Sequence, residues 1–430
     1  MRVLHTSDWH LGRSFHGASL LDEQVEAMDR IVTLVAEESI DLVLIAGDLY
    51  DRAIPPTAAV RLFNDTLLRL HRAGATVAAI SGNHDSAVRV GGQDELLNEL
   101  GIAVRGDAGR VDEPLVIAEP ADGGPPVLVY LVPYLEPLAV AGELLVESEP
   151  VVVENTEAGP GEPDVSVPDA PTLFEAASQP VTRRGRPTQD VVTNAAVERI
   201  RRHLAGYVSE VGPVRSVVVA HTFVAGGAVS ESERDLSVGN VERVSADTFD
   251  GFDLVALGHL HAPQSVRGDR IAYSGTPLPY SFSEEHHTKS VRIVDLAVDG
   301  TITARAVPLG VGRPVRTLVG ELEALLADPE LADAVEARVR VLLTDAHLPN
   351  EAMARMRSRF PHVMELRHEP AGVQPDHSQS IVGAGDLQSM EPVDLTLRFW
   401  REQHGAEATE AERDLLVAAL SAGVAHGGDA

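Results

Sequence analysis

The chain has 430 residues, 44% of them hydrophobic, which is enough for two or three globular domains with sizeable cores. It contains no cysteine, which excludes disulfides, thiolate zinc sites and a cysteine nucleophile and agrees with a cytoplasmic protein. The formal net charge of −30 argues against a protein that coats nucleic acid along its whole surface, although bound cations can reverse the sign at a local site.

The first 140 residues alternate short apolar runs with stretches in which apolar residues recur every three or four positions. This alternation is typical of buried β-strands separated by amphipathic helices. No apolar stretch approaches the length of a membrane span, and no signal peptide precedes the first run, so we expect no membrane segment. We expect strands over residues 2–6, 41–46, 76–80 and 127–132, and helices over residues 21–38, 55–73 and 92–100.

The composition changes at about residue 143. Residues 143–189 are rich in Pro, Glu, Ala and Ser and lack apolar periodicity, so we expect a disordered or loosely held insertion there. Regular patterns then return and complete a first domain, which we place at residues 1–312. They predict a helix over residues 194–208, strands over 214–220 and 252–257, and further alternating strands over 271–307.

A small α+β unit is expected over residues 313–370. It is followed by a Gly, Ser, Gln and Asp-rich linker over residues 371–390 and by a terminal segment over residues 391–423 that contains two amphipathic helices. No internal repeat is visible. Within these segments we expect strands over residues 315–319, 337–343 and 363–368, and helices over 322–326, 350–360, 394–404 and 409–420.

Five of the predicted strands end in side chains that can bind metal. Ligands gather where strands end in sheet-based enzymes, and carboxylate, imidazole and amide groups suit Mn, Fe or Zn better than Ca. Two metal ions about 3.5–4 Å apart need a bridging carboxylate, and Asp48 is the natural candidate. The strand ends carry Asp8 and His10, Asp48, Asn83 and His84, His221, and His259 and His261.

Each of these short motifs is weak when it stands alone. Asp-x-His and His-x-His occur on ordinary surfaces, and Gly-Asp-x-x-Asp is more often a turn than a site. All of them at strand ends, in one chain, indicate a metal site.

As a set, the motifs resemble the calcineurin-like metallophosphoesterases and, within them, the DNA double-strand-break repair nucleases. The narrower resemblance depends on the Trp in the first motif, the Ser after Gly-Asn-His-Asp, and Tyr273-Ser274-Gly275-Thr276-Pro277-Leu278 followed by Ser281-Phe282. It covers roughly residues 1–140 and 190–420. The five motifs are Ser7-Asp8-Trp9-His10-Leu11-Gly12, Gly47-Asp48-Leu49-Tyr50-Asp51, Gly82-Asn83-His84-Asp85-Ser86, Ala220-His221-Thr222 and Gly258-His259-Leu260-His261.

The resemblance implies an α/β (α+β) fold: a metallophosphoesterase β-sandwich flanked by helices, with a small capping domain and a C-terminal helical pair. It implies that His84 donates a proton or hydrogen bond to the leaving oxygen or the phosphate and that Asp85 orients it. Many relatives carry a histidine where Asp51 stands, so the role of Asp51 stays open. Two divalent ions, Mn²⁺ by resemblance, would be held by Asp8, His10, Asp48 and His261, and by Asp48, Asn83, His221 and His259.

The implied function is that of a DNA nuclease subunit, acting as an exonuclease on duplex ends and as an endonuclease on single strands and hairpins. The implied partners are DNA, an ATPase bound through the C-terminal helices, and a second copy of the chain, contacted through helices near residues 56–73 and 92–100. Two alternatives stay open: an enzyme for small substrates, such as a cyclic-nucleotide phosphodiesterase or a phosphatase, and a non-catalytic scaffold. The capping unit and the helical pair favour the nuclease.

Overall fold

The structure is a computed structural model of the chain, and it describes residues 1–145, 187–227, 243–370, 392–404 and 407–426. The predicted linker over residues 371–390 and nearly all of the predicted insertion over residues 143–189 lie outside the described residues. The chain divides into two compact units. The first consists of Met1–Thr317 and Glu336–Arg340, and the second of Leu318–Val335 and Val341–Ala430.

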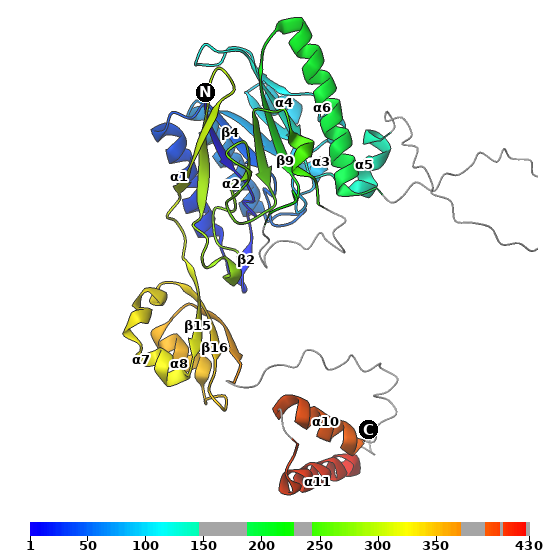
Figure 1. Cartoon of the computed structure of the whole chain (residues 1–430). Coiled ribbons are helices and arrows are strands. Elements are labelled where there is room, and N and C mark those ends of the chain that lie inside the picture. Colours follow the sequence, from blue (N-terminus) through cyan, green and yellow to red (C-terminus); the bar gives the residue numbers. More distant parts are fainter. Residues whose placement is uncertain (146–186, 228–242, 371–391, 405–406, 427–430) are drawn as a thin grey trace, which may run out of the picture. The chain divides into compact units, whose positions relative to one another are not determined.

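The first unit contains two six-stranded sheets (Figure 1). In the first sheet the order is β14-β13-β1-β4-β5-β6, with β1, β4, β5 and β6 parallel and β13 antiparallel to both of its neighbours, β1 and β14. Its strands are β1 (Arg2–Thr6), β4 (Leu42–Ala46), β5 (Thr76–Ile80), β6 (Ile102–Arg105), β13 (Ser290–Leu296) and β14 (Ile302–Pro308).

In the second sheet the order is β11-β12-β10-β9-β8-β7, with β8, β9, β10 and β12 parallel. Its edges, β7 and β11, run antiparallel to their neighbours. Its strands are β7 (Leu115–Ile117), β8 (Val127–Val132), β9 (Arg215–His221), β10 (Leu254–Gly258), β11 (Gln264–Arg267) and β12 (Ile271–Tyr273).

The two sheets pack face to face around a shared apolar core. Strand β8 shows how one strand serves two layers, because successive side chains of a strand point to opposite faces. Val127, Val129 and Leu131 pack toward the first sheet, and the alternate residues of β8 pack toward helix α6. The parallel strands are buried on both faces, which explains their almost continuous apolar sequences.

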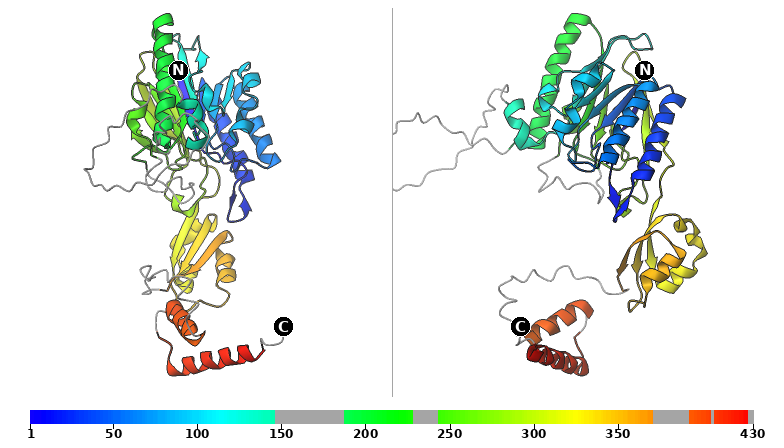
Figure 2. Two further views of the ribbon diagram at one scale, coloured as in Figure 1. Left: turned by 90° about the vertical axis from the view of Figure 1, so that its right-hand side faces the viewer. Right: turned by 180° about the vertical axis from the view of Figure 1, so that it is seen from behind.

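Helices cover the outer faces of the sandwich (Figure 2). Helices α1 and α2 cover the first sheet, while α5 and α6 cover the second. A small hairpin, β2 (Ser14–Phe15) and β3 (Ala18–Ser19), follows β1. The helices are α1 (Leu21–Glu37), α2 (Thr57–Arg72), α3 (Ala87–Gly91), α4 (Asp94–Asn98), α5 (Pro137–Leu144) and α6 (Gln189–Val211).

Two predicted helices differ from the observed ones. The helix predicted over residues 92–100 is observed only as α4, and a separate helix that was not predicted, α3, precedes it, with Gly92 and Gln93 between the two. Glycine is a poor helix former, so the break falls where propensity is lowest. Helix α6 begins five residues before its predicted start because the Thr188 side chain caps it, accepting a hydrogen bond from the Val191 amide at 3.3 Å.

The second unit contains most of the predicted α+β segment. Strands β15 (Val315–Gly320), β16 (Arg338–Leu343) and β17 (Val363–His368) form a three-stranded sheet with helices α7 (Leu322–Ala327) and α8 (Ala352–Arg359). Helices α10 (Pro392–His404) and α11 (Glu410–His426) contact each other, and α11 runs three residues past the predicted end of the terminal segment. Among the described helices, none combines the length and apolar character needed to cross a bilayer.

Candidate metal centre

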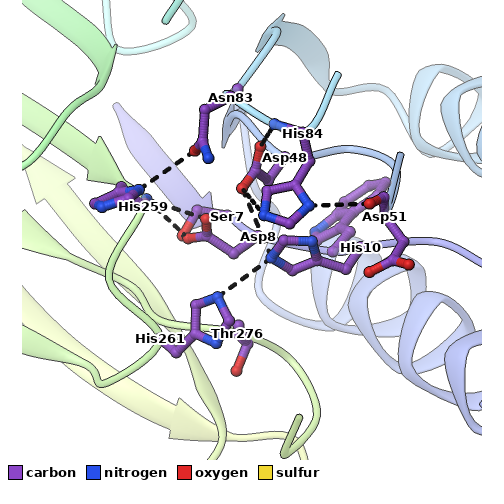
Figure 3. Close-up of polar contacts among 12 residues, drawn as sticks. Ser7, Asp8, His10, Asp48, Asp51, Asn83, His84, His259, His261 and Thr276 are labelled. Atoms are coloured by element: carbon purple, nitrogen blue, oxygen red, sulfur yellow. Dashed lines mark hydrogen bonds and ion pairs between the residues drawn. The ribbon is translucent and has the colours of Figure 1, made fainter. Parts of the chain in front are cut away.

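The carboxyl ends of β1, β4, β5, β9 and β10 meet at one edge of the sandwich, and Figure 3 shows polar side chains of this region. Parallel strands present their carboxyl ends at the same edge, and the face-to-face packing of two such sheets brings both sets of ends together. The edge is buried, and Asp8, His10 and His261 are almost wholly inaccessible to solvent. All seven residues predicted as ligands lie here, together with His84.

Asp48 lies at the middle of this cluster. Its Oδ2 atom is 3.7 Å from His10 Nε2 and 3.6 Å from His221 Nε2, so imidazoles from both sheets face one carboxylate. Its Oδ1 atom accepts a hydrogen bond from the His84 amide at 2.8 Å, which fixes the rotation of the carboxylate. Asp48 therefore has the position that a bridging ligand requires.

Asp8, His10 and His261 form one side of the cluster. Their candidate ligand atoms all lie within 4.8 Å of one another. The Nε2 atoms of His10 and His261 face each other at 3.2 Å. Two nitrogens bound to one metal ion at about 2.0–2.1 Å, with an angle near 90–110°, would lie roughly 2.8–3.4 Å apart, so the observed spacing fits a shared ion.

Asn83, His221 and His259 form the other side. The Asn83 Oδ1 atom is 2.9 Å from His221 Nε2 and 3.3 Å from His259 Nδ1. The Nδ1 atom of His221 faces the main-chain oxygen of Ala46 at 2.9 Å, which places the proton on Nδ1 and leaves the Nε2 lone pair directed at the cluster. These nitrogen and oxygen donors suit a divalent transition metal.

Burial keeps the imidazoles of the cluster in the form that binds metal. Desolvation lowers the pKa of His10, His221, His259 and His261 below the usual histidine value. A neutral imidazole has a free lone pair and needs to lose no proton when a metal ion binds. The donor set and its protonation state thus fit a resident metal ion.

The backbone at the ligands is strained. Among the described residues, seven that are not glycine have a positive φ, and four of them are Asp8 (φ 53°), His10 (φ 44°), Asp48 (φ 47°) and His259 (φ 111°). Such conformations cost of order 1–3 kcal/mol each and persist where the surrounding structure enforces them, typically at functional sites.

The structure corrects the expected role of Asp85. We expected its carboxylate to orient the His84 imidazole, but it accepts hydrogen bonds at 2.9 Å from the amides of Gly82, Leu49 and Tyr50. The His84 ring is held by the main-chain oxygen of Asp51, 2.9 Å from Nδ1. Asp85 thus fixes the loops that carry Asp48 and His84, while burial and the nearby Asp48 raise the pKa of its carboxyl group.

The prediction omitted three residues that support the ligands. Ser7 Oγ donates to Asp8 Oδ2 at 2.5 Å, and Glu284 and Lys289 lie beside His261. Ser7 stands in the first motif and could have been noticed as a neighbour of Asp8. Glu284 and Lys289 lie 23 and 28 positions from His261, and only the folded chain brings them there.

Several known proteins are similar to this chain. The chain is similar to the D subunit of the nuclease SbcCD of Bacillus subtilis (strain 168), with 29% identity over 435 residues, covering 99% of this chain and 98% of the relative. Two solved structures also align: TT1561 of Thermus thermophilus (TM-score 0.33, 14% identity, 71% of this chain and 98% of that one) and GAP50, the anchor in the inner membrane complex of Plasmodium (TM-score 0.36, 9% identity, 87% and 98%). These TM-scores are too low for any conclusion about structure or function.

The family model described as calcineurin-like phosphoesterase matches residues 1–263. This range is more than half of the chain, and it contains every residue of the cluster from Asp8 to His261. The chain belongs to the calcineurin-like phosphoesterase family.

Proposed function

We propose that the chain is the nuclease subunit of an SbcCD-type complex and hydrolyses DNA phosphodiester bonds with two divalent metal ions. The observation that carries the proposal is the convergence of seven residues with nitrogen or oxygen donors, Asp48 in their middle, at one buried edge. A relative that aligns over nearly its whole length is named as a nuclease subunit, which supports the same conclusion.

The ligands divide into two sets that share Asp48. We assign Asp8, His10, Asp48 and His261 to one ion, and Asp48, Asn83, His221 and His259 to the other. Mn²⁺ is the proposed ion, since it accepts mixed carboxylate, amide and imidazole ligands. When bound, such a pair activates a water molecule and stabilises the attacking and leaving oxygens of a displacement at phosphorus.

His84 is the proposed proton donor. Among the imidazoles of the cluster it is the most exposed, at 9%, so it is the one best placed to reach a substrate. The Asp51 main-chain oxygen holds its Nδ1 atom, while Nε2 lies 4.0 Å from Asp48 Oδ2 and faces the cluster. From there His84 would donate to the leaving 3′ oxygen or to the phosphate, and Asp85 would keep the loop in place.

DNA is the proposed substrate, with exonuclease action on duplex ends and endonuclease action on single strands and hairpins. The metal chemistry would equally serve a phosphodiesterase or phosphatase for small substrates. The additional α+β unit favours DNA, and we propose residues 313–370 as a capping domain beside a nuclease domain of residues 1–312. We further propose a cytoplasmic role in DNA end processing, replication-linked repair and recombination.

The proposed partners are an SbcC-like ATPase and a second copy of the chain. Helices α10 and α11 expose Leu395 (41%) and Leu415 (71%), and two short helices bury little surface by themselves, so we propose that residues 391–423 dock on the ATPase.

A homodimer within a heterotetramer would use α2 and α4, where Leu68 and Leu96 are exposed. A monomeric mass in solution would contradict the dimer.

Cleavage of end-labelled duplex and hairpin DNA with Mn²⁺ tests the proposal, comparing the wild type with His84→Gln. The substitution leaves the seven assigned ligands in place, so we expect bound Mn²⁺ to be retained and the cleavage rate to fall about 10²–10⁴-fold. The assay is repeated with the ATPase and ATP if the chain alone is slow. Rapid hydrolysis of small phosphodiesters with every DNA substrate left intact would contradict the nuclease.

A further inference from the structure

The segment Ser274–Lys289 connects β12 to β13, and the function proposed above assigns no role to any of its residues. It includes the Ser281-Phe282 pair of the sequence motif and a short 3₁₀ helix, η3 (Phe282–Glu284). The segment contacts Asp8, His10 or His261 directly or through a neighbouring residue. These three residues are assigned to the same metal ion, and unlike Asp48 they are not shared with the second ion.

Two of these contacts position Asp8 and His10. The Ser274 hydroxyl lies 2.9 Å from the Ser7 hydroxyl, which in turn donates to the Asp8 carboxylate at 2.5 Å. The Tyr280 hydroxyl donates to the main-chain oxygen of Trp9, and the Tyr280 ring meets the His10 ring edge-on with centroids 5.4 Å apart. The segment thus restrains both side chains from outside the cluster.

The third contact involves an ionised carboxylate. Glu284 is 1% exposed, and its Oε1 atom lies 3.3 Å from His261 Nδ1. Its other oxygen, Oε2, forms an ion pair with the Lys289 ammonium, as expected of an ionised carboxylate. Because the carboxylate can only accept, the His261 proton lies on Nδ1 and the Nε2 lone pair points toward His10 Nε2, 3.2 Å away.

Lys289 balances the charge of Glu284. Its ammonium forms an ion pair with Glu284 Oε2 and also donates to Thr276 Oγ1 at 2.7 Å and to the His261 main-chain oxygen at 3.2 Å. The Tyr280 amide donates to the same Glu284 oxygen at 3.2 Å. A buried ion pair persists when its remaining donors and acceptors are satisfied in this way.

For His221, one of the two histidines on the other side of the cluster, the nearby Asp8 carboxylate lies 4.0 Å from Nδ1, beyond hydrogen-bond distance. The Nδ1 atom of His221 faces the neutral main-chain oxygen of Ala46 at 2.9 Å. A carboxylate accepts a stronger hydrogen bond than a carbonyl group does and makes the imidazole a more basic ligand. His261 should therefore bind a metal ion more tightly than His221.

We propose that Glu284, balanced by Lys289, is a positioning residue that makes the metal site of Asp8, His10 and His261 the tighter of the two. The inference rests on the two-metal assignment made above. It predicts two unequal binding steps for Mn²⁺, with Glu284 controlling the tighter step.

The test is equilibrium binding of Mn²⁺ to the purified full-length chain, with free Mn²⁺ measured by electron paramagnetic resonance. Glu284→Gln removes the charge, and Glu284→Asp keeps the charge but retracts the carboxylate by one methylene. We expect each to weaken the tighter step by about 10–100-fold and to leave the weaker step unchanged. The control is Glu285→Gln, because Glu285 instead accepts from the Thr317 amide at 2.9 Å, and it should bind like the wild type.

The outcomes separate the inference from the proposed function. Failure of the wild type to bind Mn²⁺ would contradict the two-metal assignment itself. Two bound ions whose affinities are unchanged in both Glu284 variants would overturn only the inference. Equal weakening of both Mn²⁺ binding steps would also overturn the inference. Thermal unfolding of the metal-free variants would then show whether they had lost the fold.

Discussion

Gly82 illustrates how little freedom single residues have at the metal centre. It stands at the end of β5, where a Cβ atom would lie 2.1 Å from Asp48 Oδ1 and 2.3 Å from the Asp48 amide nitrogen. No side chain fits at that distance, so any other residue must displace Asp48 or the loop that follows β5. Glycine is required here by the close approach of two strand ends.

Gly82→Ala should therefore abolish tight Mn²⁺ binding and reduce phosphodiester hydrolysis by at least about 100-fold, since a displacement near 1 Å at a reacting centre costs that much. Metal titration and steady-state hydrolysis of the full-length chain measure the two effects. The matched control is Gly206→Ala in α6, where a Cβ atom would meet nothing within 4 Å. The control should be neutral or stabilise the helix by roughly 0.5–1 kcal/mol. Wild-type metal affinity in Gly82→Ala would show that Asp48 tolerates the displacement.

Between elements, His5 connects the two sheets beneath the metal centre. It lies on β1, and its Nε2 atom donates to the main-chain oxygen of Leu257 on β10 at 3.0 Å. Full burial, and secondarily the charge of Arg292, lowers the pKa of His5 to about 3. The bond therefore links the strand that carries Asp8 to the strand that carries His259.

This lowered pKa makes the metal-free fold sensitive to acid. Above pH 6.5 His5 is neutral in both states and adds no pH dependence. Below pH 6.5 it gains a proton only when the chain unfolds, so the free energy of unfolding falls by on the order of 1 kcal/mol per pH unit until the pH approaches the folded pKa of about 3. Urea unfolding of metal-free protein at pH 7, 6 and 5 should show a shallower decline for His5→Gln than for wild type. His286→Gln, at an exposed position, serves as the control, and equal slopes in all three proteins would contradict the prediction.

For the molecule as a whole, we propose that residues 1–312 catalyse hydrolysis and that the terminal helices bind the SbcC-like ATPase. Leu415→Glu places a charge on an exposed apolar position of α11, so association with an SbcC-like ATPase should weaken by at least about tenfold. Mn²⁺ binding and hydrolysis by the chain alone should stay unchanged. Leu348→Glu is the control, because Leu348 is also exposed but lies in the predicted capping domain. Equal effects of both substitutions in a pull-down would argue against docking through α11.

Much of the secondary structure could be predicted from the sequence because it depends on local periodicity. The strands over residues 2–6, 76–80, 127–132 and 363–368 have the predicted bounds, since apolar runs bounded by turn residues have few alternative conformations. The elements β6, β7, β11 and α5 were not predicted from the sequence. Positions of the predicted insertion that the structure does not describe stay untested.

The sequence by itself determined which residues gather at the metal centre. Parallel strands present their carboxyl ends at one edge of a sheet, so ligand-type residues at five strand ends were expected to lie together once the sheets packed. Only the tertiary structure decided what supports those residues: the main-chain oxygen of Asp51 behind His84, the amides around Asp85, and Glu284 beside His261. Some of these contacts join residues that are far apart in the chain. Others are made by main-chain amides and carbonyl oxygens, which every residue type provides. Their formation depends on how two sheets pack, and local sequence carries no signal of that packing.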